Sequence, residues 1–162
     1  MPVDLGVSAV YQLELKIPPL ALCVVFAIVI VALGYFVPIA NVPFPGHQVA
    51  AVSLLLSGMV VAGAGVLQFR LAKTSVNPMA PNRASSIVAS GVFSLSRNPM
   101  YVGMALALLG LSAWRSTLPG YVLVPLFCMY MTEFQIKPEE RALLVRFGGE
   151  FSAYMATVRR WL

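Results

Sequence analysis

Charged residues are scarce in this sequence, and acidic residues are scarcer than basic ones. Only 10% of the 162 residues are charged, with 11 Lys and Arg against 6 Asp and Glu, whereas 59% are hydrophobic. Soluble domains are about one-quarter charged. The low charge, with a mean hydropathy of +0.84, excludes an ordinary soluble domain and indicates an integral membrane protein.

Histidine and cysteine are almost absent as well. His47 is the only histidine, which argues against a histidine-based metal site and against a Cys–His nucleophile, so we expect no metal. Cys23 and Cys128 both lie inside apolar runs, where cysteine usually packs as a small hydrophobe, so we expect no disulfide. The net charge of +5 is read as a topology signal and not as a nucleic-acid surface.

Long uncharged runs are what the sequence does contain. We predict an all-α integral membrane protein that forms a single membrane domain over residues 1–162. Its four transmembrane helices are expected at about residues 17–37, 48–69, 99–114 and 117–132. The last two are short and close together, which predicts a tight helical hairpin whose arms tilt, thin the bilayer or bury deeply in the bundle. An amphipathic cytoplasmic helix is expected to follow them.

The basic residues predict the topology. They gather in the middle loop, as Arg70, Lys73, Arg83 and Arg97, and near the C-terminus, as Lys137, Arg141, Arg146, Arg159 and Arg160. The positive-inside rule therefore places both segments and both termini in the cytoplasm. Arg115, at the outer tip of the hairpin, is the one exception. No ionisable residue lies in the middle of a span, which argues against a transporter.

A helix start coincides with the mouth of the third span. Asn98 suits an N-cap and Pro99 the first helical position, so the helix presents its free N–H groups at the cytoplasmic interface as an anion site. Arg97 adds a planar guanidinium whose N–H donors can bind both oxygens of a carboxylate or phosphate. Tyr101 lies one helical turn further on. The alternative is a capped helix with a snorkelling arginine.

A carboxylate heads the apolar face of the C-terminal segment. If a helix starts near Pro138, one stripe contains Glu140, Leu144, Phe147, Phe151, Tyr154 and Val158. Glu139 falls on the flank with Arg146, where surface pairing would explain it. A buried carboxylate needs a cation, and Arg97 or a bound cation would serve Glu140. A structural Arg–Glu pair tying the tail to the bundle is the alternative. The Gly148-Gly149 pair is a possible break.

Two long motifs carry a family resemblance. The runs TSVNPMAPNRASSIVASGVFSLSRNPMYVGM and FQIKPEERALLVRFGGEFSAYMATVRRW resemble the isoprenylcysteine carboxyl methyltransferase and phospholipid methyltransferase superfamily, and most of all its short bacterial members. The resemblance implies a multi-pass protein of the bacterial inner membrane that uses S-adenosylmethionine and releases S-adenosylhomocysteine. The cofactor is expected at the cytoplasmic end, between segments of about 74–101 and 133–161. By position it implies cofactor contacts from Arg97, Asn98, Pro99, Tyr101, Glu139 and Glu140.

The expected reaction is direct transfer of a methyl group to a lipophilic or amphiphilic acceptor that arrives from the membrane lipid. Glu140 and Arg97 are the candidate catalytic residues, with Glu140 as the base if the acceptor is an ammonium. Related prenylcysteine enzymes commonly have histidine where this chain has Asn98, which weakens the case for a prenylcysteine and leaves carboxylates, amines and thiols open. The rival hypothesis is a non-catalytic membrane scaffold with a basic lipid- or partner-binding face.

Overall fold

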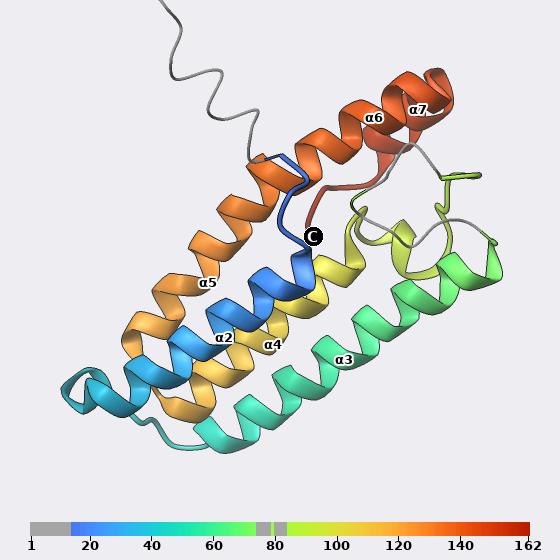
Figure 1. Ribbon diagram of the computed structural model, residues 1–162. Helices are drawn as coiled ribbons and strands as arrows, with labels where there is room; N and C mark the ends of the chain where they lie inside the picture. The colour runs from blue at the N-terminus through green and yellow to red at the C-terminus, as the bar shows by residue number, and fades with distance from the viewer. Residues whose placement is uncertain (1–13, 74–78, 80–83) are drawn as a thin grey trace, which may run out of the picture.

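The computed structural model describes residues 14–73, 79 and 84–162, and every regular element in that part of the chain is helical. Four helices lie side by side in one bundle: α2 (Pro19–Phe36), α3 (His47–Leu71), α4 (Pro99–Arg115) and α5 (Leu118–Tyr130) (Figure 1). Helix α4 is central, because it packs against each of the other three. The prediction of an all-α protein is confirmed for the described residues.

Two helices are long and apolar enough to cross a membrane. They are α2, with 18 residues, and α3, with 25. Only 22% and 17% of their apolar windows is buried inside the protein, whereas the core helix of a soluble protein is mostly buried. Helices α4 and α5 have 17 and 13 residues, and Ser116 and Thr117 join them. The count of four membrane crossings therefore stays a prediction.

Glycines let α3 and α4 approach closely. A Cβ on Gly58 would lie 2.6 Å from the Gly103 carbonyl oxygen, and a Cβ on Gly103 would lie 2.5 Å from that of Gly58. Gly65 faces Met100 and Pro99 at the start of α4, whereas Gly63 faces open space. Of these two glycines, Gly65 therefore serves helix packing and Gly63 does not. This close packing holds the start of α4 firmly against the bundle.

The fourth bundle helix does not stop at the end of α5. It continues through a π-helical turn, η4 (Met131–Ile136), into α6 (Lys137–Phe147) without a break in helical backbone. Pro138 lies in the first turn of α6, as predicted, but α6 continues a helix already under way and does not start a separate one. Proline has no N–H with which to bond the carbonyl four residues earlier. Here that carbonyl, on Phe134, accepts a bond from the Leu15 N–H at 3.0 Å, so the helix passes the proline without leaving a polar group unpaired.

The C-terminal segment forms two short helices and not one amphipathic helix. Helix α6 ends at Gly148, whose φ of +54° and ψ of −122° suit glycine alone, and α7 (Gly149–Thr157) runs in a new direction. The expected apolar stripe is therefore divided. Phe151, Tyr154 and Val158 still form a buried cluster against which Leu144 and Phe147 pack, because α7 folds back over the 3-10 turn η3 (Gly91–Ser94).

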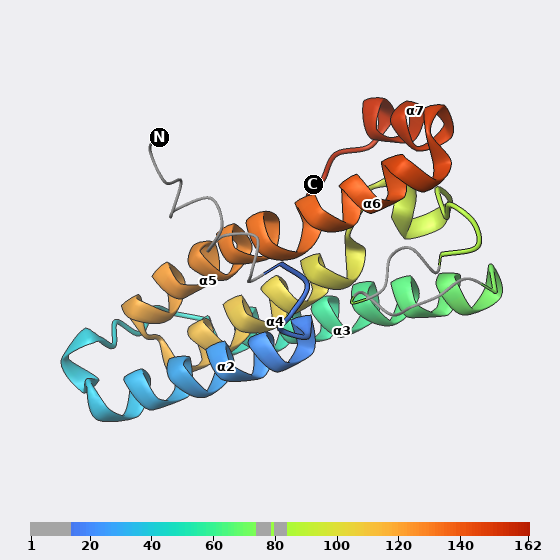
Figure 2. The same cartoon turned by 45° about the horizontal axis from the view of Figure 1, so that its top comes forward.

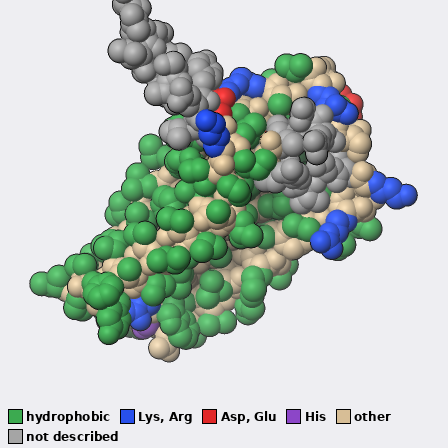
Figure 3. All heavy atoms as spheres, in the orientation of Figure 1, with side chains coloured by type: hydrophobic (Ala, Val, Ile, Leu, Met, Phe, Trp, Pro, Cys, Tyr) green, Lys and Arg blue, Asp and Glu red, His purple; other side chains and the backbone are tan. Residues whose placement is uncertain are grey.

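Charge is concentrated at one end of the bundle. Figure 3 shows hydrophobic side chains over most of the visible surface, with most of the charged side chains at the end of the bundle that holds α6, α7 and the last turns of α3. After α7 the chain returns toward the start of α4, where it ends (Figure 2). The segments predicted to hold a cofactor meet at this end, except that residues 74–78 and 80–83 of the first lie outside the described part of the chain.

Candidate functional site

The C-terminal residues are hydrogen-bonded to the segment that opens α4. The Arg97 backbone N–H donates to the Arg159 carbonyl at 2.9 Å, and the Asn98 side-chain amide donates to the Arg160 carbonyl at 2.9 Å. The Trp161 indole N–H donates to the Thr132 hydroxyl at 3.0 Å. Segments far apart in the sequence are therefore joined at one point, where α4, η4 and the C-terminus meet.

Glu140 lies between two arginines at this point. Its Oε1 is 2.6 Å from Arg97 Nη2, and its Oε2 is 2.6 Å from Arg160 Nη2. Arg160 Nε makes a third contact, at 3.1 Å from Oε1. The side chains of Arg97 and Glu140 are each 9% exposed. Burial raises the pKa of Glu140, but the hydrogen bonds and charges of Arg160 and Arg97 outweigh it, so the pKa lies below its usual value. The expected cationic partner of Glu140 is therefore Arg97, joined by Arg160.

Arg97 also holds the end of α7. Its Nη1 donates to the Met155 carbonyl at 3.1 Å and to the Val158 carbonyl at 2.5 Å. Its Nε is buried and has no hydrogen-bond partner among the described residues. The structural pair that ties the tail to the bundle is thus present, and the Nε–H of the guanidinium has no partner among the described residues.

Glu139 faces inward and not along the surface. Its Oε1 accepts a hydrogen bond from the Tyr101 hydroxyl at 2.6 Å and another from the Gln135 amide. Among the described residues no Lys or Arg forms an ion pair with it, so the expected surface pairing beside Arg146 is wrong. Burial and the charge of Glu140 raise the pKa of Glu139, and the two hydrogen bonds lower it. The net pKa is about 7. Within this part of the chain, Glu139 is a carboxylate without a counter-charge.

The remaining predicted residues occupy the expected positions with altered contacts. Asn98 is the N-cap and Pro99 the first residue of α4, but the Asn98 side chain does not cap the helix, because it is bonded to Arg160. The Tyr101 ring is packed in the hydrophobic core, so its hydroxyl and not its ring face reaches Glu139. The structure thus brings together all six residues that the resemblance implied.

Two residues of the cluster were missed from the sequence. Arg160 was counted only as a topology signal, yet a buried carboxylate at Glu140 needs more than one donor to be satisfied. Gln135 lies four residues before Glu139, which is the spacing of neighbours on a helix face. A helix extended backward past Pro138 would have revealed Gln135, whereas the place of Arg160 depends on a chain reversal at Gly148 that no local pattern specifies.

The cluster suits a ligand that carries both an amine or sulfonium and a carboxylate. Glu139 offers a carboxylate that no cation of the described residues satisfies, and Arg97 offers a buried N–H that no acceptor there satisfies. Buried polar atoms are normally paired, so the unpartnered Arg97 Nε is the exception here, while Glu139 is hydrogen-bonded but lacks a cation. No group of three or more His, Cys, Asp or Glu suited to a metal occurs among residues 14–73, 79 and 84–162.

Comparison with known proteins identifies the family. The profile of the phospholipid methyltransferase family matches residues 47–150, which is more than half of the chain. The chain belongs to the phospholipid methyltransferase family. The match runs from the start of α3 into α7, so it includes Arg97, Tyr101, Glu139 and Glu140, and the resemblance stated from the two motifs is confirmed.

One curated relative of this phospholipid methyltransferase family member is short. It is an uncharacterized protein of Haemophilus influenzae, 36% identical over 63 residues, which are 39% of this chain and 100% of the relative. No solved structure matches the chain. The family and the two long apolar helices together indicate a membrane methyltransferase.

Proposed function

We propose that this protein is an integral membrane methyltransferase that uses S-adenosylmethionine to methylate a lipophilic or amphiphilic acceptor. The observation that carries the proposal is the uncompensated Glu139 carboxylate beside the Arg97–Glu140 pair, within the region matched by the family. We further propose four membrane crossings with this cluster on the cytoplasmic side. The gathering of basic residues at that end of the bundle supports this orientation.

Each charged residue has a distinct proposed role toward the cofactor. Glu139 holds a cationic group, because its present hydrogen bonds come only from neutral side chains. The unused Nε of Arg97 binds a carboxylate, while Glu140 holds the Arg97 guanidinium in place. Asn98 and Pro99 form the adjoining wall. The cofactor supplies a methyl group on a sulfonium, which becomes a neutral thioether when the methyl leaves.

The candidate base moves from Glu140 to Glu139 in this proposal. A general base works best when its pKa lies near the working pH. Glu139 has a pKa of about 7, whereas two arginines hold the pKa of Glu140 below its usual value. If the acceptor is an ammonium lipid, Glu139 takes its proton before the amine attacks the methyl group. A carboxylate or thiolate acceptor needs no base, so with such an acceptor Glu139 serves only to hold the cofactor.

The first test is calorimetric binding of S-adenosylmethionine and S-adenosylhomocysteine to the purified protein. We expect micromolar binding to wild type, lost in Arg97→Ala and Glu139→Gln. Binding should tighten as pH rises from 6 to 8, because Glu139 must lose its proton to pair with a cation.

Glu150→Gln is the matched control for this test, since Glu150 is an exposed glutamate in the first turn of α7. It should bind as wild type does. Absence of binding to folded wild type would favour the rival hypothesis, a scaffold whose basic face binds anionic lipid or a partner. Retained binding in Glu139→Gln would remove Glu139 from the cofactor site.

A further inference from the structure

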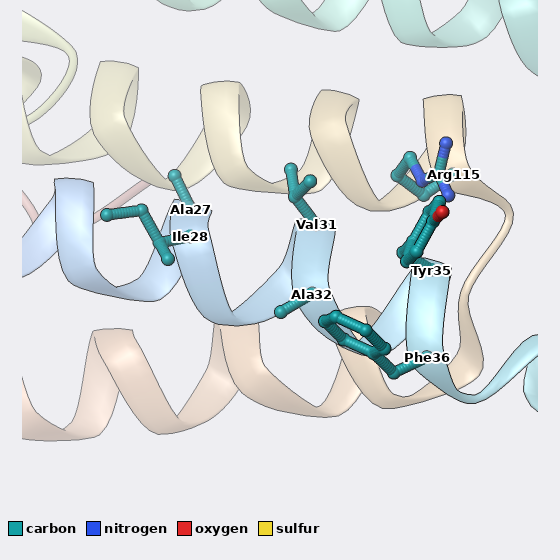
Figure 4. A pocket seen from close by; sticks show the side chains of 7 residues that line it. All are labelled: Ala27, Ile28, Val31, Ala32, Tyr35, Phe36 and Arg115. Carbon is teal, nitrogen blue, oxygen red and sulfur yellow. The ribbon is translucent and has the colours of Figure 1, made fainter.

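A second site lies at the opposite end of the bundle and is independent of the proposed methyl transfer. A groove of about 460 Å³ runs along α2 and is closed at one end by Arg115, the last residue of α4. Its lining residues are Ala27, Ile28, Val31, Ala32, Tyr35, Phe36 and Arg115 (Figure 4). A volume of this size is within the range of small-molecule sites.

The shape of the groove follows from helix geometry. Ala27, Val31 and Tyr35 are spaced four residues apart, as are Ile28, Ala32 and Phe36, so each set forms one ridge of α2. The span from Ala27 to Phe36 covers roughly 13 Å of helix axis. The groove is therefore an extended apolar track that suits a hydrocarbon chain.

Arg115 gives this track a charged end. Its side chain crosses α2 at Gly34, where an added Cβ would lie 3.0 Å from both Cβ and Nε of Arg115. In Figure 4 it lies beside Tyr35. Its Nε is buried without a hydrogen-bond partner, and no acidic residue in the described part of the chain forms an ion pair with Arg115. An arginine in an apolar setting requires an anion or water.

The position of Arg115 matches the headgroup level of a membrane leaflet. Helix α4 has 17 residues, which correspond to about 25 Å, close to the thickness of a bilayer core. Arg97 precedes one end of α4 and Arg115 is at the other, so the two lie near opposite faces. Tyr35, beside Arg115, and Phe36, at the same end of the groove, are 70% and 77% exposed, as aromatic residues are at the membrane interface.

We propose that this groove binds an anionic phospholipid of the leaflet opposite the candidate active site. The Arg115 guanidinium receives the phosphate, and one acyl chain lies along Ala27, Val31 and Ala32. Charge complementarity decides the occupant: a neutral lipid tail fills the track but leaves Arg115 unpaired, and a soluble anion pairs with Arg115 but leaves the track empty.

The test is native mass spectrometry of the detergent-purified full chain with three probes of matched chemistry. These are phosphatidylglycerol, diacylglycerol with the same chains, and glycerol phosphate. We expect retained phosphatidylglycerol, with affinity about tenfold weaker in Arg115→Gln and intermediate in Arg115→Lys, which keeps the charge without the fork. Arg70→Gln, the same change in an exposed arginine near the other end of the bundle, should stay within about twofold of wild type.

Ala32→Phe narrows the track without altering Arg115, so it tests the site even if Arg115→Gln does not fold. It should weaken phosphatidylglycerol binding while leaving the protein monomeric or oligomeric as before. Equal retention of diacylglycerol, equal retention of glycerol phosphate, or no effect of either variant would overturn the proposal. A change of oligomeric state in Ala32→Phe would also overturn it, because the groove would then be covered by a second copy of the chain.

Discussion

Glu139 and Glu140 are neighbours on α6 but lie in opposite electrostatic surroundings. Glu140 is held by Arg97 and Arg160 and has a lowered pKa. Glu139 is held by Tyr101 and Gln135, and burial raises its pKa to about 7. A carboxylate that is paired with cations stabilises the fold, whereas a buried carboxylate without a cation lowers stability but remains available to bind a cationic ligand. The comparison therefore separates a residue that builds the site from a residue available to a ligand.

Removing the charge of Glu140 is expected to have the largest effect on stability. Glu140→Gln leaves Arg97 and Arg160 without their shared carboxylate, and unpairing a buried ion pair destabilises by about 4 kcal/mol. We expect this loss in the free energy of unfolding in detergent, together with faster proteolysis of the C-terminal segment that Arg97 holds. Glu150→Gln is the control and should change stability by less than about 0.5 kcal/mol. Equal stability of both variants would contradict the structural role of Glu140.

Glu139→Gln should change stability in the opposite direction to Glu140→Gln, because it should make the protein more stable at pH 8. Glu139 titrates at about 7 when folded against 4.5 in its ordinary state, so the folded chain binds a proton more tightly than the unfolded chain. The contribution of Glu139 to stability is therefore full below about pH 4.5, falls as pH rises to about 7 and stays low above it. The total loss is at most about 3 kcal/mol.

The measurement is the melting temperature of wild type and Glu139→Gln across this pH range. The variant should lack the decline and should be the more stable protein at pH 8. A parallel pH dependence in both proteins would show that Glu139 is not the group responsible.

Removing the Tyr101 hydroxyl is expected to have a smaller effect on the Glu139 carboxylate. Tyr101→Phe removes a hydrogen bond that lowers the pKa of Glu139, so the midpoint of the pH-dependent decline should move upward. The cost above that midpoint should be about 1.5 kcal/mol, because the hydrogen bond is made to a charged group. The measurement is the pH midpoint of Tyr101→Phe against that of wild type, and Glu139→Gln/Tyr101→Phe is the control, which should show no decline. An unmoved midpoint would mean that the Tyr101 hydrogen bond does not lower the Glu139 pKa.

The sequence predicted one of the two glutamates well, for a physical reason. Glu140 lies on an apolar stripe at helical spacing, and a buried carboxylate requires a cation, so periodicity and charge were enough to name Arg97 as its partner. The break at the Gly148-Gly149 pair could also be named, because glycine permits a backbone that other residues disfavour.

Glu139 was misplaced because its surroundings are non-local. The side that it faces depends on how the continuous helix of α5, η4 and α6 packs against Tyr101 of α4, and no spacing within α6 encodes that contact. Arg160 escaped notice for the same reason, since the chain reaches it only after turning at Gly148. Periodicity thus identified the buried face of one helix but not the partner across it.

The π-helical turn at Met131–Ile136 has a consequence for how chains of this kind vary in length. A π turn closes its hydrogen bonds over five residues and not four, so it accommodates one residue more than an α turn. Removing one residue there would let the turn relax to an α-helix while α5 and α6 kept their orientations. The same deletion inside α4 would rotate one half of that helix by about 100°. Single-residue gaps between relatives should therefore fall within this turn.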